Sequence, residues 1–321
     1  MVKKKKIIII AGITLLLVLI IVTTFMVIKS RQTGNGYYNN TKTENFVIND
    51  YLEDGNNERV KVILLSGQSN ASGVSSTQYL KSNITEEEFE KYSNGFDNIY
   101  INYFVDNGNN TSNGFVKAGL NQGCLQGYFG PELGLAKKLS ENTDEKVFII
   151  KCSYSGTAIS NLWNVKSYKF NEKRLYVAFK NFVKENIEYL KSKHYDIDIM
   201  SFCWMQGESD AINIVDAESY EKNLNNLVEA IRNDLKKYDN NIYFLDALIA
   251  EDTFWTYSKI VNEQKRQFAD KSEYNIIIDT VSAKLTVHNE PLDNPDKAHY
   301  DSLSEIKLGE LFANQILEIL R

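Results

Sequence analysis

Four polar clusters follow predicted strands, and together they could supply an acyl-transfer site. The first is the string Gly67-Gln68-Ser69-Asn70, in which a tight glycine turn could lift a serine hydroxyl clear of a sheet. A serine hydroxyl attacks a carbonyl only when a neighbouring base removes its proton. Ser69 is therefore the candidate nucleophile, with Gln68 and Asn70 as candidate supporting residues. An ordinary Ser/Asn turn explains the same string about as well.

The base must be sought among only three histidines. His299 has a carboxylate three residues earlier, Asp296, close enough in a turn to hold the ring in the required tautomer. His194 lies among lysines at a predicted helix end, where we expect it to be solvated. His288 lies in a polar loop and stays as a competing base. Two further carboxylates are alternative orienting groups, or else surface or capping residues: Asp293 and Asp301.

The remaining clusters could stabilise an oxyanion. Ser155-Gly156-Thr157 follows a predicted strand, and glycine lets backbone N–H groups approach a ligand closely. The segment from Trp204 to Asp210 follows another strand and offers the neutral side-chain donor Gln206. In the same segment Glu208 is either structural or a brace for the loop. Each cluster taken singly could be an ordinary loop.

These residues need a scaffold, and the rest of the sequence predicts one. Apolar runs alternate with amphipathic segments, the pattern of a parallel sheet covered by helices on both faces. Predicted strands cover residues 60–66, 98–104, 146–152, 197–204, 242–249 and 274–279. Predicted helices cover 131–140, 172–190, 219–238 and 302–320, the first opened by Pro131. Ligands bind at the carboxyl ends of such strands, where all four clusters fall.

The order of these motifs resembles that of the SGNH hydrolases, specifically the sialate O-acetylesterase and acetylxylan esterase group. The resemblance rests on Gly-Gln-Ser-Asn, Ser-Gly-x-Thr, Trp-x-Gln-Gly-Glu-Ser-Asp and Asp-x-x-His in that order, over residues 60–318, and on Gly130-Pro131-Glu132-Leu133-Gly134. It implies a doubly wound, flavodoxin-like α/β domain. It also implies Ser69 as nucleophile, His299 as base and Asp296 as orienting group, with oxyanion donors from the backbones of Ser69 and Gly156 and the side chain of Gln206.

The implied activity is a carbohydrate O-acetylesterase that forms an acetyl-enzyme and needs no metal or organic cofactor. The substrate would be sialic acid or an acetylated polysaccharide, and the sequence does not choose between them. A lipid or thioester hydrolase on the same fold is an alternative, as is a non-catalytic glycan-binding surface protein. The Asn/Gly-rich loop 106–126 matches no pattern that we can name, but its length suggests a functional role. Three aromatic residues could stack on sugar rings or belong to the core: Tyr128, Trp163 and Trp255.

The N-terminal segment predicts a membrane anchor. Ile7 to Ile28 is 22 residues without a charge, roughly 33 Å as a helix and enough to span a bilayer. No small-residue cleavage site follows, and four lysines precede the segment, so the N-terminus should be cytoplasmic and the remainder outside. We expect residues 1–28 to be a basic stub and anchor, 29–57 a polar linker, and 58–321 the esterase domain.

The composition argues against some classes of binding partner. A net charge of −6 argues against a nucleic-acid partner, because phosphate binding needs clustered positive charge. The three cysteines, Cys124, Cys152 and Cys203, have no metal-ligand spacing. We expect Cys152 and Cys203 to be buried core residues, with a disulfide between them possible only if their strands are neighbours.

Overall fold

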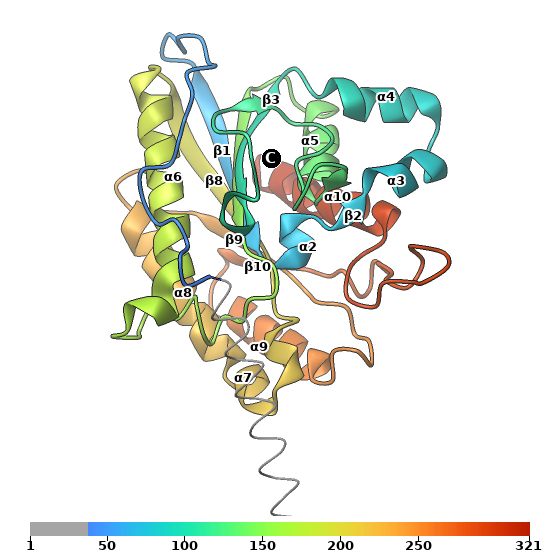
Figure 1. Cartoon of the computed structure of the whole chain (residues 1–321). Helices are drawn as coiled ribbons and strands as arrows, with labels where there is room; N and C mark the ends of the chain where they lie inside the picture. The colour runs from blue at the N-terminus through green and yellow to red at the C-terminus, as the bar shows by residue number, and fades with distance from the viewer. Residues whose placement is uncertain (1–37) are drawn as a thin grey trace, which may run out of the picture. The chain divides into compact units, whose positions relative to one another are not determined.

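The computed structural model describes residues 38–321, of which Thr41–Arg321 form one compact unit. Its centre is an eight-stranded, mostly parallel sheet with the order β10-β9-β8-β1-β7-β3-β4, and with β5 paired to β3 (Figure 1). The six parallel strands are β1 (Arg59–Gly67), β3 (Ile99–Val105), β7 (Val147–Ser153), β8 (Asp196–Met205), β9 (Tyr243–Ala247) and β10 (Asn275–Ile278). All six lie within two residues of the predicted strands.

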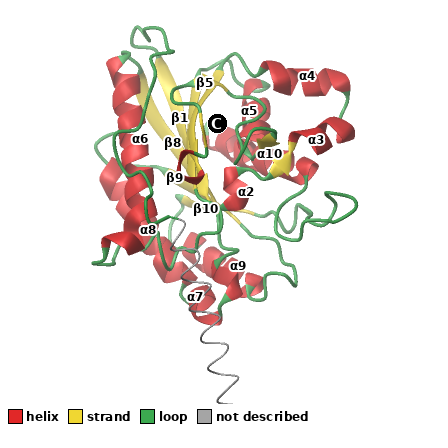
Figure 2. Ribbon diagram, in the orientation of Figure 1, coloured by secondary structure: helices red, strands yellow, loops and turns green. Residues whose placement is uncertain are grey.

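Helices cover both faces of this sheet, as the alternating pattern predicts (Figure 2). On one side lie α5 (Glu132–Ser140) and α10 (Ser302–Ile319), and on the other α6 (Arg174–Ser192) and α8 (Tyr220–Leu235). The apolar face of α6 is buried, from Leu175 through Phe182 to Leu190. Shorter helices complete the unit: α2 (Ser69–Ser72), α3 (Thr77–Asn83), α4 (Glu86–Asn94), α7 (Ile214–Glu218) and α9 (Ser258–Ala269).

The strand order differs from the flavodoxin-like order that we expected. In that order the first strand lies between the second and the third. Here β7, the third parallel strand in the chain, lies between β1 and β3. The alternating pattern predicts parallel strands but not which of them become neighbours, because every order uses similar crossovers. Burial agrees with the observed place of β7, whose residues are all buried as in a central strand.

The loop 106–126 continues the sheet beyond its parallel part. Two short strands within it, β4 (Asn110–Thr111) and β5 (Val116–Lys117), pair antiparallel with β3. An uncovered edge strand would present unpaired backbone groups, so this loop closes the edge of the sheet. Its last part passes close to the first polar cluster, because the Cys124 N–H donates to the Gly73 carbonyl at 2.8 Å.

Helix α9 has no counterpart among the predicted helices. Its buried residues follow helical spacing, but three of them are polar: Ser258, Asn262 and Lys265. The Lys265 ammonium is fully buried and paired with Asp246 at the end of β9. Because polar residues occupy its inward positions, the hydrophobic periodicity that marks an amphipathic helix is weak here.

The part of the predicted linker around residues 45 and 46 packs against the rest of the compact unit. Phe46 is 8% exposed and makes edge-to-face contacts with Phe104 and Phe182. The Glu185 carboxylate accepts hydrogen bonds from the N–H groups of Asn45 and Phe46. Single apolar residues in an otherwise polar segment give no periodicity, so the sequence alone does not reveal this packing.

The predicted anchor, residues 7–28, lies outside the described residues. Within residues 38–321, no helix combines the length and apolar character needed to cross a membrane. The cysteines at 152 and 203 are free and buried, as expected. Strand β1 lies between their strands, β7 and β8, so these two residues are not on neighbouring strands.

Candidate active site

Ser69 begins helix α2 at the carboxyl end of the central strand β1, and it is 7% exposed. The turn before it depends on Gly67, whose φ is +144°. A Cβ atom at this position would lie 1.9 Å from the Met205 carbonyl oxygen, so only glycine lets β1 end this close to β8. The strand end and its glycine therefore fix where Ser69 stands.

Asp296 and His299 make the contact that their spacing predicts. Asp296 Oδ2 lies 2.7 Å from His299 Nδ1, and Oδ1 accepts the N–H groups of Ala298 and His299 at 2.7 and 3.2 Å. Burial would raise the pKa of Asp296, but these hydrogen bonds outweigh it and hold the pKa below its ordinary value. An ionised carboxylate on Nδ1 keeps a proton there and leaves Nε2 free to act as a base.

Asn70 connects this pair with the serine turn across the fold. Its Oδ1 accepts the Tyr300 N–H at 3.1 Å, and its Nδ2 lies 3.5 Å from the Ala298 carbonyl oxygen. The residue beside Ser69 thus holds the backbone on both sides of His299. Within residues 38–321 no hydrogen bond joins Ser69 Oγ to the imidazole, so the described link between the two runs through Asn70.

Glu208, in the segment after β8, holds the side chain of Asn70. Its Oε1 accepts the Asn70 amide at 2.6 Å, while the whole side chain is only 1% exposed. Burial raises the pKa of the Glu208 carboxyl above its ordinary value. This contact supports the reading of Glu208 as a brace, and it assigns Asn70 a positioning role between Glu208 and the histidine loop.

The other two histidines have partners of their own. His288 Nε2 lies 2.8 Å from Asp252 Oδ2, and the His288 N–H donates to the Asp296 carbonyl. His194 is solvated, with a side chain 64% exposed, and it pairs with Asp54. Asn70 contacts the backbone beside His299 and not the backbone beside His194 or His288. Of the two alternative carboxylates, Asp301 caps helix α10 and Asp293 is exposed.

The two backbone N–H groups predicted as oxyanion donors are free to donate. In the described part of the chain, the N–H groups of Ser69 and Gly156 have no hydrogen-bond acceptor, and Gly156 is exposed with φ +68°. The neighbouring Ser155 is fixed by Asp106, which accepts its N–H at 2.6 Å and its hydroxyl at 2.9 Å. Asp106 was not among the predicted site residues, although its place directly after β3 is a signal for one.

Gln206 does not fit the oxyanion role that the resemblance implies. Its Nε2 has three acceptors for two hydrogens: Asp210 Oδ2 at 2.7 Å, the Thr157 carbonyl at 2.9 Å and Gln68 Oε1 at 3.3 Å. Its Oε1 accepts the Tyr220 hydroxyl at 2.9 Å, and the side chain is fully buried. Gln206 instead ties the turn after β8 to the loop that carries Gly156.

Asp210 completes this connection. Its carboxylate accepts the N–H groups of Ile159 and Ser160 as well as the Gln206 amide. Burial raises the pKa of Asp210 to about 7, although those donors oppose the shift. The last residue of the fourth cluster is therefore a structural link that sequence reasoning left without a role.

A buried ion pair fixes the other end of α2. Lys151 Nζ donates to Ser72 O at 3.0 Å, to Gln122 O at 2.9 Å and to Glu132 Oε2 at 2.6 Å, and both charged side chains are fully buried. Lys151 is thus saturated and positions the short helix that begins with Ser69. The sequence signal was a lysine inside the apolar run of β7.

The three aromatic residues that could stack on sugar rings differ in burial. Trp163 is 1% exposed and donates to Thr157, so it belongs to the core. Trp255 is largely buried and Tyr128 is half-buried. Among residues 38–321, no group of three or more His, Cys, Asp or Glu side chains is arranged to hold a metal ion.

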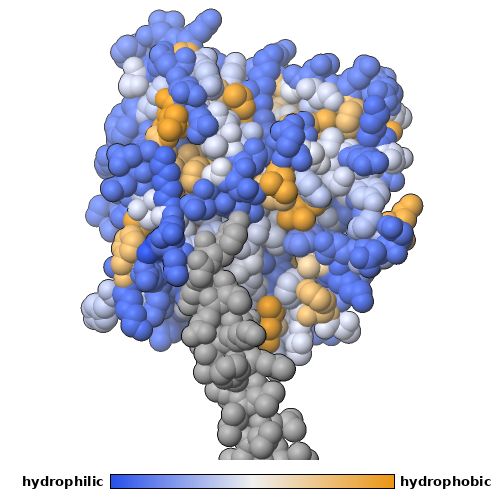
Figure 3. Space-filling view, in the orientation of Figure 1, coloured by the Kyte–Doolittle hydropathy of each residue, from blue (hydrophilic) through white to orange (hydrophobic). Residues whose placement is uncertain are grey.

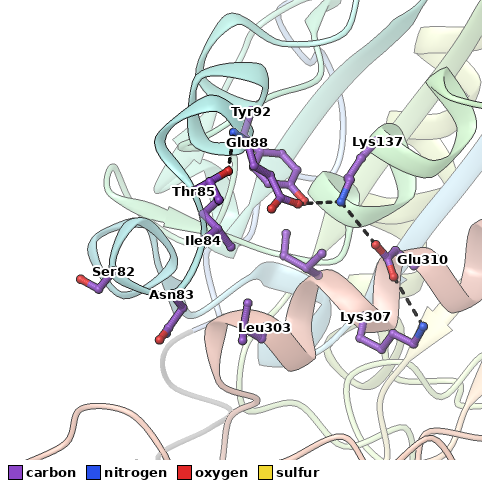
Figure 4. A pocket seen from close by; sticks show the side chains of 11 residues that line it. Ser82, Asn83, Ile84, Thr85, Glu88, Tyr92, Lys137, Leu303, Lys307 and Glu310 are labelled. Carbon is purple, nitrogen blue, oxygen red and sulfur yellow. Dashed lines mark hydrogen bonds and ion pairs between the residues drawn. The ribbon is translucent and has the colours of Figure 1, made fainter.

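A groove of about 600 Å³ lies away from these residues, between α3, α4, α5 and α10 (Figure 4). Lys137 spans it between Glu88 and Glu310, and Leu303 and Ile84 line its apolar part. None of Ser69, Asp296 or His299 lines this groove. Its lysines and carboxylates pair with one another, so it adds no catalytic group to the predicted site.

Comparison with known proteins supports the family resemblance that the order of the motifs indicates. Residues 59–318 match the model of a family described as carbohydrate esterase, sialic acid-specific acetylesterase. A probable carbohydrate esterase of Arabidopsis thaliana is 32% identical over 109 residues, a match that spans 33% of this chain and only 37% of the plant protein.

Solved structures support the fold. An X-ray structure of an Arabidopsis thaliana protein matches with a TM-score of 0.60 and 21% identity, over 80% of this chain and 98% of that one. The crystal structure of NanS matches with a TM-score of 0.57 and 16% identity, over 82% of this chain and 98% of that one. At these identities the two structures bear on the fold alone.

Proposed function

Because the chain belongs to the carbohydrate esterase family of sialic acid-specific acetylesterases, we propose that it is a serine esterase that removes O-acetyl groups from a carbohydrate. The substrate class is an acetylated sialic acid or an acetylated polysaccharide. The observation that carries the proposal is the Asn70 contact, which ties the turn bearing Ser69 to the loop bearing the Asp296–His299 pair.

The proposed reaction proceeds in two halves. His299 Nε2 takes the proton of Ser69 as Oγ attacks the acetyl carbonyl, and the tetrahedral intermediate collapses to an acetyl-enzyme when the sugar hydroxyl leaves with that proton. A water molecule then attacks the acetyl-enzyme by the same route and releases acetate. Asp296 holds the ring and stabilises the imidazolium in both halves.

The surface is compatible with a polar substrate. The face seen in Figure 3 is mostly hydrophilic, and its hydrophobic side chains form small separate groups.

Acetate release tests the proposal. We expect residues 38–321 to release acetate from at least one of O-acetylated sialic acid, acetylated xylan and O-acetylated cell-envelope polysaccharide, measured by an enzyme-coupled acetate assay. The Ser69→Ala variant is the matched control and should release none above the uncatalysed rate. Activity on long-chain acyl esters without activity on any acetylated glycan would contradict the proposed substrate class.

We further propose that residues 7–28 anchor the protein in the cell membrane, with the N-terminus cytoplasmic and the esterase domain outside. The uncharged length of this segment and the lysines before it support this topology. The protein should then appear at full length in the membrane fraction, and protease added to intact cells should remove the domain. Recovery of a mature chain beginning beyond Ile28 in the medium would contradict the anchor.

A further inference from the structure

Gly156, whose N–H is one of the two backbone donors of the proposed oxyanion hole, is not held by packing of its own. It is exposed, its φ is +68°, and a Cβ atom added to it would meet nothing within 4 Å beyond its chain neighbours. An oxyanion donor works best when it is fixed before the reaction, because it then costs no reorganisation as charge develops. The direction of this N–H must therefore be set by the neighbouring residues.

The residues on either side of Gly156 are both held. Thr157 is 1% exposed, and its carbonyl accepts the Gln206 amide at 2.9 Å. On the other side, the Asp106 carboxylate accepts the Ser155 N–H at 2.6 Å and the Ser155 hydroxyl at 2.9 Å. The Ser155 carbonyl and the Gly156 N–H belong to one planar peptide unit, so a contact that holds Ser155 also directs this N–H.

Asp106 is itself held in a defined turn. It directly follows β3, which pairs with β7, the strand that ends two residues before Ser155. Asp106 is 8% exposed and has a φ of +48°, and Asn107 has a φ of +62°. Aspartate and asparagine tolerate this left-handed region better than most residues. The Lys42 N–H donates to Asn107 Oδ1 at 2.8 Å, so the N-terminal segment also holds this turn.

We propose that Asp106 is a positioning residue for acyl transfer, whose carboxylate holds Ser155 so that the Gly156 N–H faces the acetyl oxygen. This inference rests on the proposed esterase function and adds a residue that acts through Ser155 and not on the substrate. As Ser69 Oγ bonds to the acetyl carbon and its proton passes to His299, the carbonyl π electrons move onto oxygen. That oxygen then accepts a hydrogen bond from the Gly156 N–H.

Asp106→Gly is the first test. Glycine suits the positive φ of this position, so the change removes the carboxylate without opposing the backbone conformation. With p-nitrophenyl acetate as substrate, we expect kcat to fall by about 10²-fold with KM within a few-fold of the parent, because a misdirected donor weakens binding of the transition state alone. The affinity for methylboronic acid, which forms a tetrahedral anion on a catalytic serine, should fall on the same scale.

Two further variants accompany it. Asp106→Asn keeps an oxygen that can accept the Ser155 N–H, so its kcat should stay within about tenfold of the parent. Asn113→Gly is the matched control, because Asn113 lies in the same loop with a φ of +50° and its side chain accepts a hydrogen bond from Thr111. Its kcat and its boronate affinity should both stay within a few-fold of those of the parent.

If folded Asp106→Gly keeps kcat and boronate affinity within a few-fold of the parent, even with a lower melting temperature, Asp106 serves only the fold and the inference is wrong. It is also wrong if Asp106→Asn loses as much as Asp106→Gly, since the hydrogen bond to the Ser155 N–H would then not be what matters. If Asp106→Gly does not fold, Ser155→Ala decides the question. It removes one of the two hydrogen bonds and should lower kcat about tenfold with KM unchanged, and an undiminished kcat would refute the inference. A parent protein that hydrolyses no ester at all would instead refute the proposed function.

Discussion

The His299→Ala variant is expected to lose about 10⁶-fold in kcat, the scale on which removal of a catalytic histidine disables a serine hydrolase. Without the imidazole, Ser69 keeps its proton and is a poor nucleophile. Ser69→Ala should lose about as much, and the double variant should lose no more than either single variant, because the two groups act as one unit. Initial rates with p-nitrophenyl acetate measure all three.

The matched control is His288→Ala. His288 also pairs with an aspartate, Asp252, and lies in the same loop, yet only its backbone N–H contacts the catalytic pair. Its side chain can therefore be removed with a loss in kcat of less than about tenfold, since no step of acyl transfer passes through it. A loss in His288→Ala equal to that in His299→Ala would transfer the role of base to His288.

The Asp296→Asn variant is expected to lose about 10⁴-fold in kcat with its fold intact. Asparagine keeps an oxygen for the N–H groups of Ala298 and His299, so the loop geometry survives. Its amide nitrogen would face His299 Nδ1, however, and would favour the tautomer that carries its proton on Nε2. That tautomer cannot accept the proton of Ser69.

Asp252→Asn provides the same chemical change on the other histidine–aspartate pair. We expect its kcat to stay within about tenfold of the parent, because His288 transfers no proton in the proposed reaction. Thermal unfolding of both variants separates loss of activity from loss of the fold. Equal losses in kcat in the two folded variants would show that the tautomer of His299 is not what Asp296 controls.

Two buried ion pairs lie near the predicted site. Lys151 and Glu132 are buried on one side of α2, and Lys265 and Asp246 on the side of β9. The Lys151 ammonium uses all three of its hydrogens, one of them on the last residue of α2. Breaking such a pair leaves an uncompensated buried charge, so both pairs have a structural role, and the Lys151–Glu132 pair also holds the end of α2.

Local features of the sequence determined much of this protein. The strand positions follow from apolar runs, because a buried strand must be apolar whatever its neighbours are. The contact between Asp296 and His299 follows from three residues of separation, a distance that a single turn closes. The position of Ser69 after β1 follows from one strand and one glycine. In each case the signal and the structure lie within a few consecutive residues.

Features that join distant segments were decided only by the tertiary structure. The contact between Asn70 and Tyr300 spans 230 positions, and the place of β7 between β1 and β3 depends on how crossovers pack. The two glutamines show the reason most clearly. Gln68 and Gln206 carry the same amide, but folding places N–H donors around the oxygen of the first and acceptors around the nitrogen of the second, because a hydrogen bond depends on position in space and not on residue type.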